Sequence, residues 1–152
     1  MKRQFIAPLV FIMLFAASAC SHFTWDDTGD YGGQWYLTQI DTIGKSVSVD
    51  YTAEKVFWAI QGKILEVKQL KNKQPGEGKD GIVFHYEQKK DSLLLREPRY
   101  SLRMKGDPEV EDVTALKTYG INSLEDSFYV ETISGSKMVL RNKLLRLHFK
   151  SF

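Results

Sequence analysis

Apolar and polar residues alternate along most of the chain from Gly33 onward, with the period of two that is typical of β-strands. Most of the segments between these stretches are short, which indicates antiparallel neighbours joined by hairpins. The pattern predicts eight strands, at Gln34–Thr42, Val56–Gln61, Ile64–Leu70, Gly81–Gln88, Ser92–Glu97, Ser127–Ile133, Lys137–Arg141 and Leu144–Ser151.

Tight turns test this pattern, because a turn fixes which residues of a hairpin face one another. A two-residue loop at Gly62-Lys63 sets Trp58 opposite Val67 and Ile60 opposite Leu65, which makes one face wholly apolar. Two further loops give the same two-faced result, Lys90-Asp91 with Tyr86 opposite Leu95, and Asn142-Lys143 with Leu140 opposite Leu145 and Met138 opposite Leu147.

Eight short strands with one apolar face each are expected to close into a barrel, because closure leaves no unpaired edge. A sandwich of two sheets is the alternative. The interior of an eight-stranded barrel is either filled by side chains or holds one small ligand. The side chains predicted to point inward, as the lining of any ligand cavity, are Trp35, Trp58, Ile60, Val67, Phe84, Tyr86, Leu95, Phe128, Val130, Met138, Leu140, Leu147 and Phe149.

One segment departs from the strand pattern. Asp107-Pro108-Glu109 is typical of a helix start, with an aspartate cap and a proline in the first position. Val110, Val113 and Leu116 then recur at helical spacing, and Gly120 is a typical stop. The sequence therefore predicts a helix of about three turns between the fifth and sixth strands, where it would cover one mouth of the barrel.

The first 19 residues differ from the rest of the chain. Lys2 and Arg3 precede an apolar run from Phe5 to Ala16, and small residues follow that run. This layout is typical of a secretory signal, and the run is too short for a membrane-spanning helix. Residues 20–32 are rich in Gly and Asp and lack periodicity, so we expect a tether between the signal and an all-β domain at 33–152.

Cys20 is the only cysteine, and it follows Ala17-Ser18-Ala19 at the expected cleavage point. The arrangement resembles the lipobox of bacterial lipoproteins, although that pattern prefers Leu where Ala17 stands. The resemblance implies that the Cys20 thiol carries acyl chains such as palmitate. These chains would anchor the exported protein to the bacterial outer membrane, facing the periplasm or the cell surface, because each buried CH₂ contributes about 0.8 kcal/mol.

A second resemblance concerns the domain itself. Gly33-Gln34-Trp35 on the first predicted strand is similar to the Gly-x-Trp signature of lipocalins, and the C-terminal third resembles the ending of bacterial lipocalin-like lipoproteins, a family of mostly uncharacterised exported proteins. The residues that carry this second likeness are Leu116, Tyr119-Gly120-Ile121, Phe128, Val130, Met138, Leu140, Leu145, Leu147 and Phe149. The resemblance implies an eight-stranded antiparallel up-and-down barrel without an agreed ligand. Carriage of a small hydrophobic molecule follows only by analogy with classical lipocalins.

The net charge of the domain argues against a nucleic-acid partner. The 152-residue chain has a net charge of +2, but removal of Lys2 and Arg3 from its 21 basic residues leaves 19, equal to its 19 acidic residues. A neutral domain has no basic patch for a nucleic acid. The histidines lack metal-ligand spacing, with His85 and His148 expected to point outward, so we predict neither a metal site nor a cofactor.

No catalytic motif is present, and we expect no enzyme. The carboxylates that an acid–base pair would need are predicted on outer faces or near strand ends, at Glu66, Glu87, Glu97 and Glu131. Two hypotheses remain. One is a lipid-tethered barrel that binds a small hydrophobic ligand, and the other is an interaction or structural lipoprotein with a filled barrel, acting through the loops Ile43–Lys55 and Lys71–Asp80.

Overall fold

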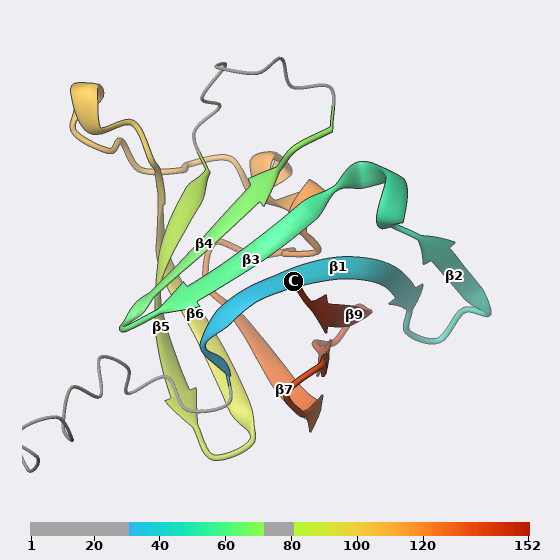
Figure 1. Cartoon of the computed structure of the whole chain (residues 1–152). Helices are drawn as coiled ribbons and strands as arrows, with labels where there is room; N and C mark the ends of the chain where they lie inside the picture. The colour runs from blue at the N-terminus through green and yellow to red at the C-terminus, as the bar shows by residue number, and fades with distance from the viewer. Residues whose placement is uncertain (1–30, 72–80) are drawn as a thin grey trace, which may run out of the picture.

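A computed structural model describes residues 31–71 and 81–152 of the chain (Figure 1). Within these ranges the backbone forms nine strands, connected in several places by short 3-10 helices. In chain order these elements are β1 (Gly33–Thr42), β2 (Val47–Asp50), η2 (Thr52–Glu54), β3 (Val56–Gln61), β4 (Ile64–Gln69), β5 (Ile82–Lys89), β6 (Ser92–Tyr100), η3 (Arg103–Lys105), η4 (Val113–Tyr119), β7 (Asp126–Ile133), β8 (Lys137–Arg141) and β9 (Leu145–Ser151).

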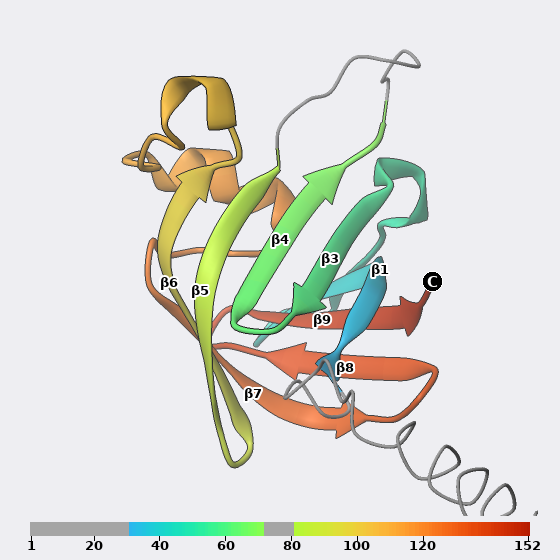
Figure 2. The same ribbon diagram turned by 60° about the vertical axis from the view of Figure 1, so that its left-hand side comes forward.

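The barrel closes through its first and last strands. β1 pairs with β3, each later strand pairs with the next, and β9 pairs back with β1 over residues 35–42. Eight strands make up this ring, because β2 pairs only with β1 among the described strands. In the ring, β3–β6 cross β7–β9 at a steep angle (Figure 2). The predicted eight-stranded antiparallel up-and-down barrel is therefore confirmed, and the sandwich alternative is excluded.

The hairpin registers match the sequence prediction at two of the three tested turns. Trp58 pairs with Val67 across the β3–β4 hairpin, and Tyr86 pairs with Leu95 across the β5–β6 hairpin. Gly62 begins the first of these turns with a φ of 58°, a conformation that glycine adopts without steric cost. The alternation of apolar residues thus fixed both the register and the buried face.

The prediction for the β8–β9 hairpin was wrong in its register. Leu140 pairs with Leu147 rather than Leu145, and Met138 pairs with Phe149 rather than Leu147. The cause is the side chain of Asn142, whose Oδ1 accepts hydrogen bonds from the backbone N–H groups of residues 144 and 145 at 2.9 and 2.8 Å. The turn consequently spans residues 142–145, and a shift of two leaves every side chain on its predicted face.

The predicted helix exists between β6 and β7, but it begins later and is shorter than expected. It is the seven-residue 3-10 helix η4, about two turns long, and Asp112 caps it by accepting a hydrogen bond from the Thr114 backbone N–H. Residues 108–110 instead run extended beside the end of β6, with hydrogen bonds from Tyr100 N to Pro108 O and from Val110 N to Pro98 O. β7 pairs with β6 only as far as Leu95, so this segment satisfies backbone groups that β7 leaves unpaired.

The connection Ile43–Lys55 contains a strand that the pattern did not predict. β2 folds back on β1 as a hairpin that projects from the ring (Figure 1), with Ile40 paired to Val49 and Thr42 to Val47. Both valines are about half exposed, at 48% and 49%. Val47-Ser48-Val49-Asp50 does alternate, but the run is only four residues long and buries neither face, so the pattern alone predicts a loop there.

Candidate functional site

The barrel interior is the site that the sequence predicts, and its side chains form one apolar cluster. Trp58 lies at the centre, with its ring 5.6 Å from that of Phe128 and 5.1 Å from that of Phe149. Of the predicted inward residues, those that are buried are Trp35, Trp58, Ile60, Val67, Phe84, Leu95, Phe128, Met138, Leu140, Leu147 and Phe149. Tyr86 and Val130 are half-buried and pack against the edge of the same cluster.

The interior is packed with side chains. A void large enough to admit a water molecule would leave exposed surface on the side chains around it. Trp58, Phe84 and Phe128 have 0% exposure, as do Leu65, Val67, Leu95, Met138, Leu140 and Leu147. The middle of the barrel therefore resembles an ordinary close-packed core. A ligand among these side chains requires some of them to move, and their role as a ligand lining stays a prediction.

The polar groups of the interior aromatics bond to the backbone. The indole N–H of Trp35 donates to the carbonyl of Tyr31 at 2.8 Å, and that of Trp58 donates to the carbonyl of Tyr119 at 3.2 Å. The hydroxyl of Tyr86 donates to the carbonyl of Gly62 at 2.7 Å. A buried indole N–H or phenol needs such a partner, and here the fold itself supplies one.

η4 covers the mouth of the barrel where Trp58 reaches the end of the interior. Leu116 of η4 is fully buried, and the helix contacts β3 and β4. Gly120 ends the helix with a φ of 79°, and a Cβ atom there would lie 2.7 Å from Leu147 Cδ2. Burial raises the pKa of Tyr119, and the neighbouring Tyr100 raises it further. The mouth is thus closed by a short helix that turns Leu116 inward and whose last tyrosine remains half-buried.

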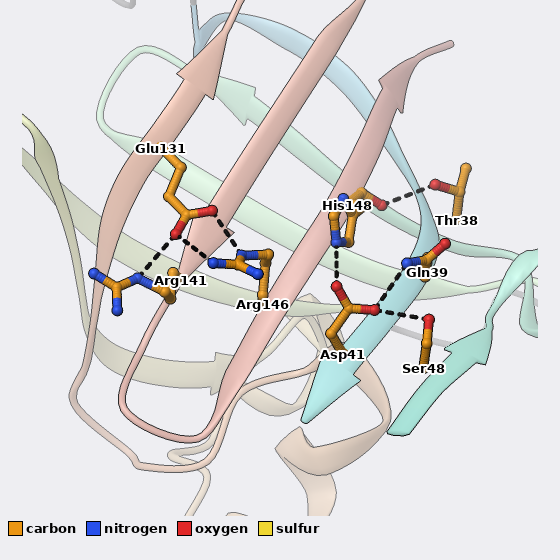
Figure 3. Close-up of polar contacts among 8 residues, drawn as sticks. All are labelled: Thr38, Gln39, Asp41, Ser48, Glu131, Arg141, Arg146 and His148. Atoms are coloured by element: carbon orange, nitrogen blue, oxygen red, sulfur yellow. Dashed lines mark hydrogen bonds and ion pairs between the residues drawn. The ribbon is translucent and has the colours of Figure 1, made fainter. Parts of the chain in front are cut away.

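A polar cluster lies on the outer face of the strands that close the ring (Figure 3). Glu131 on β7 bonds to Arg141 Nε at 2.9 Å and to the guanidinium of Arg146 at 2.7 and 3.0 Å. The hydrogen bonds from Arg146 lower the pKa of Glu131, against the opposing effect of burial, and the charge of Arg141 lowers it further. This cluster joins β7, β8 and β9 on the outside of the barrel.

Asp41 forms the second part of this outer face (Figure 3). Its Oδ2 lies 2.7 Å from His148 Nε2, and its Oδ1 accepts hydrogen bonds from Gln39 and Ser48, each at 2.8 Å. Burial alone would raise the pKa of Asp41, but the hydrogen bonds from Gln39, His148 and Ser48 outweigh it and lower the pKa to about 2. Thr38 adds a bond to the His148 carbonyl at 3.0 Å.

These residues do not form a nucleophilic triad. A serine nucleophile needs its hydroxyl against the histidine, with the carboxylate on the far side of the ring. Here the carboxylate of Asp41 lies between Ser48 and His148 and holds both. The arrangement pins β2 and β9 to β1, which is a structural role.

Other sequence predictions fall elsewhere. Cys20, the signal, the tether up to residue 30 and most of the loop Lys71–Asp80 lie outside the described residues.

Within the described ranges, no group of three His, Cys, Asp or Glu side chains is placed to hold a metal ion. Over the same ranges no helix has the length and apolar character that crossing a membrane requires. His85 is exposed, and its Nε2 lies 4.0 Å from a carboxylate oxygen of Glu97.

Comparison with known proteins places the fold in a family. A family model described as a lipocalin-like domain matches residues 13–152. The chain belongs to this lipocalin-like domain family. The resemblance drawn from Gly33-Gln34-Trp35 and the C-terminal third is thereby confirmed. No curated protein matches the chain.

Two solved structures are similar to this lipocalin-like domain. A lipocalin-like protein from Bacteroides uniformis superposes with a TM-score of 0.59 at 21% identity, over 82% of this chain and 100% of the other. An uncharacterized protein from Bacteroides eggerthii superposes with a TM-score of 0.57 at 19% identity, over 80% of this chain and 98% of the other. At these identities the likeness shows a shared fold.

Proposed function

We propose that this lipocalin-like protein is an exported lipoprotein, tethered to the bacterial outer membrane through Cys20, whose filled barrel acts through its outer surface and loops. The proposal of a filled barrel rests on the complete burial of the interior side chains around Trp58. A barrel that is filled by its own residues has no room for a resident ligand. Its recognition surfaces are then the loops and outward strand faces.

The tether is supported by the signal-like segment 1–19 and by the single cysteine directly after it. In cells supplied with labelled palmitate, we expect the protein to take up label and the variant Cys20→Ser to lose it. Ser21→Ala, next to the cysteine, is the matched control and should label normally. Label that persists in Cys20→Ser would show that the anchor is elsewhere or absent.

The filled interior has its own test. Native mass spectrometry of the purified chain should give the mass of the protein without a bound small molecule. The same preparation, denatured and extracted with organic solvent, should release no apolar compound in stoichiometric amount. Recovery of such a compound would contradict the filled-barrel proposal and leave the tether unaffected.

Binding of a small hydrophobic ligand is the second candidate. It is favoured by the short helix that closes the mouth of the barrel, because such a helix could act as a lid. η4 is short, and Leu116 is its one fully buried side chain, while Ala115 and Tyr119 pack partly buried against the core. Displacement of this helix would open a path to an interior of aromatic and aliphatic side chains, the usual lining of a lipophilic pocket. Trp58 would report the event, because its indole N–H bonds to the last residue of η4.

A fluorescent fatty acid is a suitable probe for this candidate. If η4 is a lid, Leu116→Ala should bind the probe several-fold more tightly than the unmodified chain, because the variant loosens the closed state. Lys117→Gln, on the exposed side of the same helix, is the control and should bind like the unmodified chain. Equal and negligible binding by all three proteins would exclude carriage of this class of ligand.

A further inference from the structure

A groove of about 520 Å³ lies on the outer face of β3–β6, on the opposite side of these strands from the filled interior. The strand pairing shows how it is built. Ala59 pairs with Glu66, Glu66 with Val83, and Val83 with Arg99, so these four outward side chains form one row across the strands. An adjacent row contains Gln61, Ile64 and His85. Polar and apolar side chains thus alternate across the floor, where Ile64 and Val83 lie next to Glu66 and His85.

Two strained residues form the wall of this groove at its β6 end. The β5–β6 register shifts between Val83 and His85, and Glu97 stands in the resulting bulge with a φ of 52°. Asp107 follows the η3 turn with a φ of 49°. Residues other than glycine rarely adopt this strained conformation, and bulges redirect side chains. Both residues line the groove, so the chain is distorted where the wall forms.

Asp107 also presents an unsatisfied group. Its Oδ1 atom is buried, yet it has no hydrogen-bond partner within the described part of the chain. A buried carboxylate oxygen without a donor is unfavourable, so such atoms are uncommon in native proteins. A turn of the carboxyl group about its Cβ–Cγ bond would bring this oxygen to the groove, where a donor from a bound molecule would satisfy it. On the same wall, Arg103 is exposed and forms no ion pair within the described residues.

The charges of the lining indicate the kind of molecule. Three carboxylates, Glu66, Glu97 and Asp107, face two arginines, Arg99 and Arg103, together with His85. A ligand with one strong charge would meet groups of its own sign somewhere in this lining. A neutral molecule that both donates and accepts hydrogen bonds meets no such conflict, and its carbon-bound faces can rest on Ala59, Ile64 and Val83.

We propose that this groove binds a small, neutral, hydroxyl-rich molecule of the sugar type. Its hydroxyls donate to the carboxylates of Asp107 and Glu97 and accept from Arg103, while its apolar face lies on Ile64 and Val83. The site is independent of lipidation at Cys20 and of the state of the barrel interior. Its success or failure is therefore separate from that of the proposed function.

The test uses the full chain, purified in detergent, on an array of neutral, acidic and amine-bearing glycans, with spermidine and citrate as non-sugar probes. Binding to neutral glycans is expected. For the neutral glycan that binds best, Asp107→Asn and Glu97→Gly should each weaken the affinity about tenfold, because the first replaces a charged acceptor by a weaker neutral one and the second removes an acceptor. Asn and Gly both accept a positive φ, so these variants keep the backbone in place.

Glu87→Gln is the matched control, because Glu87 lies outward on β5 beyond His85 and is not among the residues that line the groove. Its affinity should equal that of the unmodified chain, and circular dichroism should show that all variants are folded. The proposal is overturned if no neutral glycan binds, if only spermidine or citrate binds, or if Asp107→Asn and Glu97→Gly bind as tightly as Glu87→Gln.

Discussion

Asp41 shows which residue roles depend on contacts between distant parts of the chain. Alternation with Leu147 and Phe149 predicted that His148 points outward, and the structure agrees. Its partner Asp41 is 107 positions away and meets it only because β9 pairs with β1. Nothing local to either residue indicates that pairing. Glu131 was likewise expected as a solvated carboxylate, whereas two arginines hold it.

The low pKa of Asp41 predicts how the free energy of unfolding changes in acid. Its value falls from 3.8 to about 2 on folding, so the carboxylate favours the folded state above pH 4, and this contribution is lost as the pH falls through 2. Asp41→Asn should lower the free energy of unfolding by about 1–2 kcal/mol at pH 7 and by much less at pH 2. Urea unfolding at both values measures this, with Glu87→Gln as the surface control. A loss that is the same at both pH values would contradict the assignment.

The elements show where local patterns were sufficient and where they were not. The alternation of apolar residues located all eight ring strands, because each strand buries one face. It missed β2, which buries none. It also placed the helix cap at Asp107, because Asp-Pro-Glu is a good start in isolation; the backbone of that segment is instead taken up by the edge of β6. Asn142 shifted the last hairpin by a side-chain bond that alternation does not reveal.

Gly120 gives a prediction at the scale of the element, because it ends η4 against β9. Gly120→Ala adds a Cβ atom 2.7 Å from Leu147 Cδ2 in a backbone conformation with a φ of 79°. We expect a loss of about 2–4 kcal/mol from strain and overpacking together. Gly106→Ala is a matched control, because its φ is 74° but nothing lies within 4 Å, so it should lose only about 1 kcal/mol. Thermal unfolding compares them, and equal losses would show that the contact with Leu147 does not restrain η4.

At the scale of the whole molecule, the question that the sequence left open was whether an eight-stranded barrel is filled or hollow. The inward residues could be named from alternation, but their packing depends on the radius of the ring and on the way that β3–β6 cross β7–β9 (Figure 2). Trp58 fills the centre because rings from β7 and β9 reach it from across the barrel. Removal of that one side chain should therefore convert the filled barrel into a hollow one.

Trp58→Ala should lower the free energy of unfolding by about 3–5 kcal/mol and leave a dry void inside the barrel. The variant should then bind benzene or xenon, which the unmodified chain excludes, and calorimetry or ¹²⁹Xe NMR measures this. Phe57→Ala is the control, because Phe57 lies on the same strand but stacks outside the ring on Tyr36, with centroids 4.9 Å apart. It should lose less stability and bind neither molecule. If Trp58→Ala is too unstable to purify, Trp58→Phe makes a smaller void with the same expected sign. Benzene binding by the unmodified chain would mean that its interior already opens to small apolar molecules, as the carriage hypothesis requires.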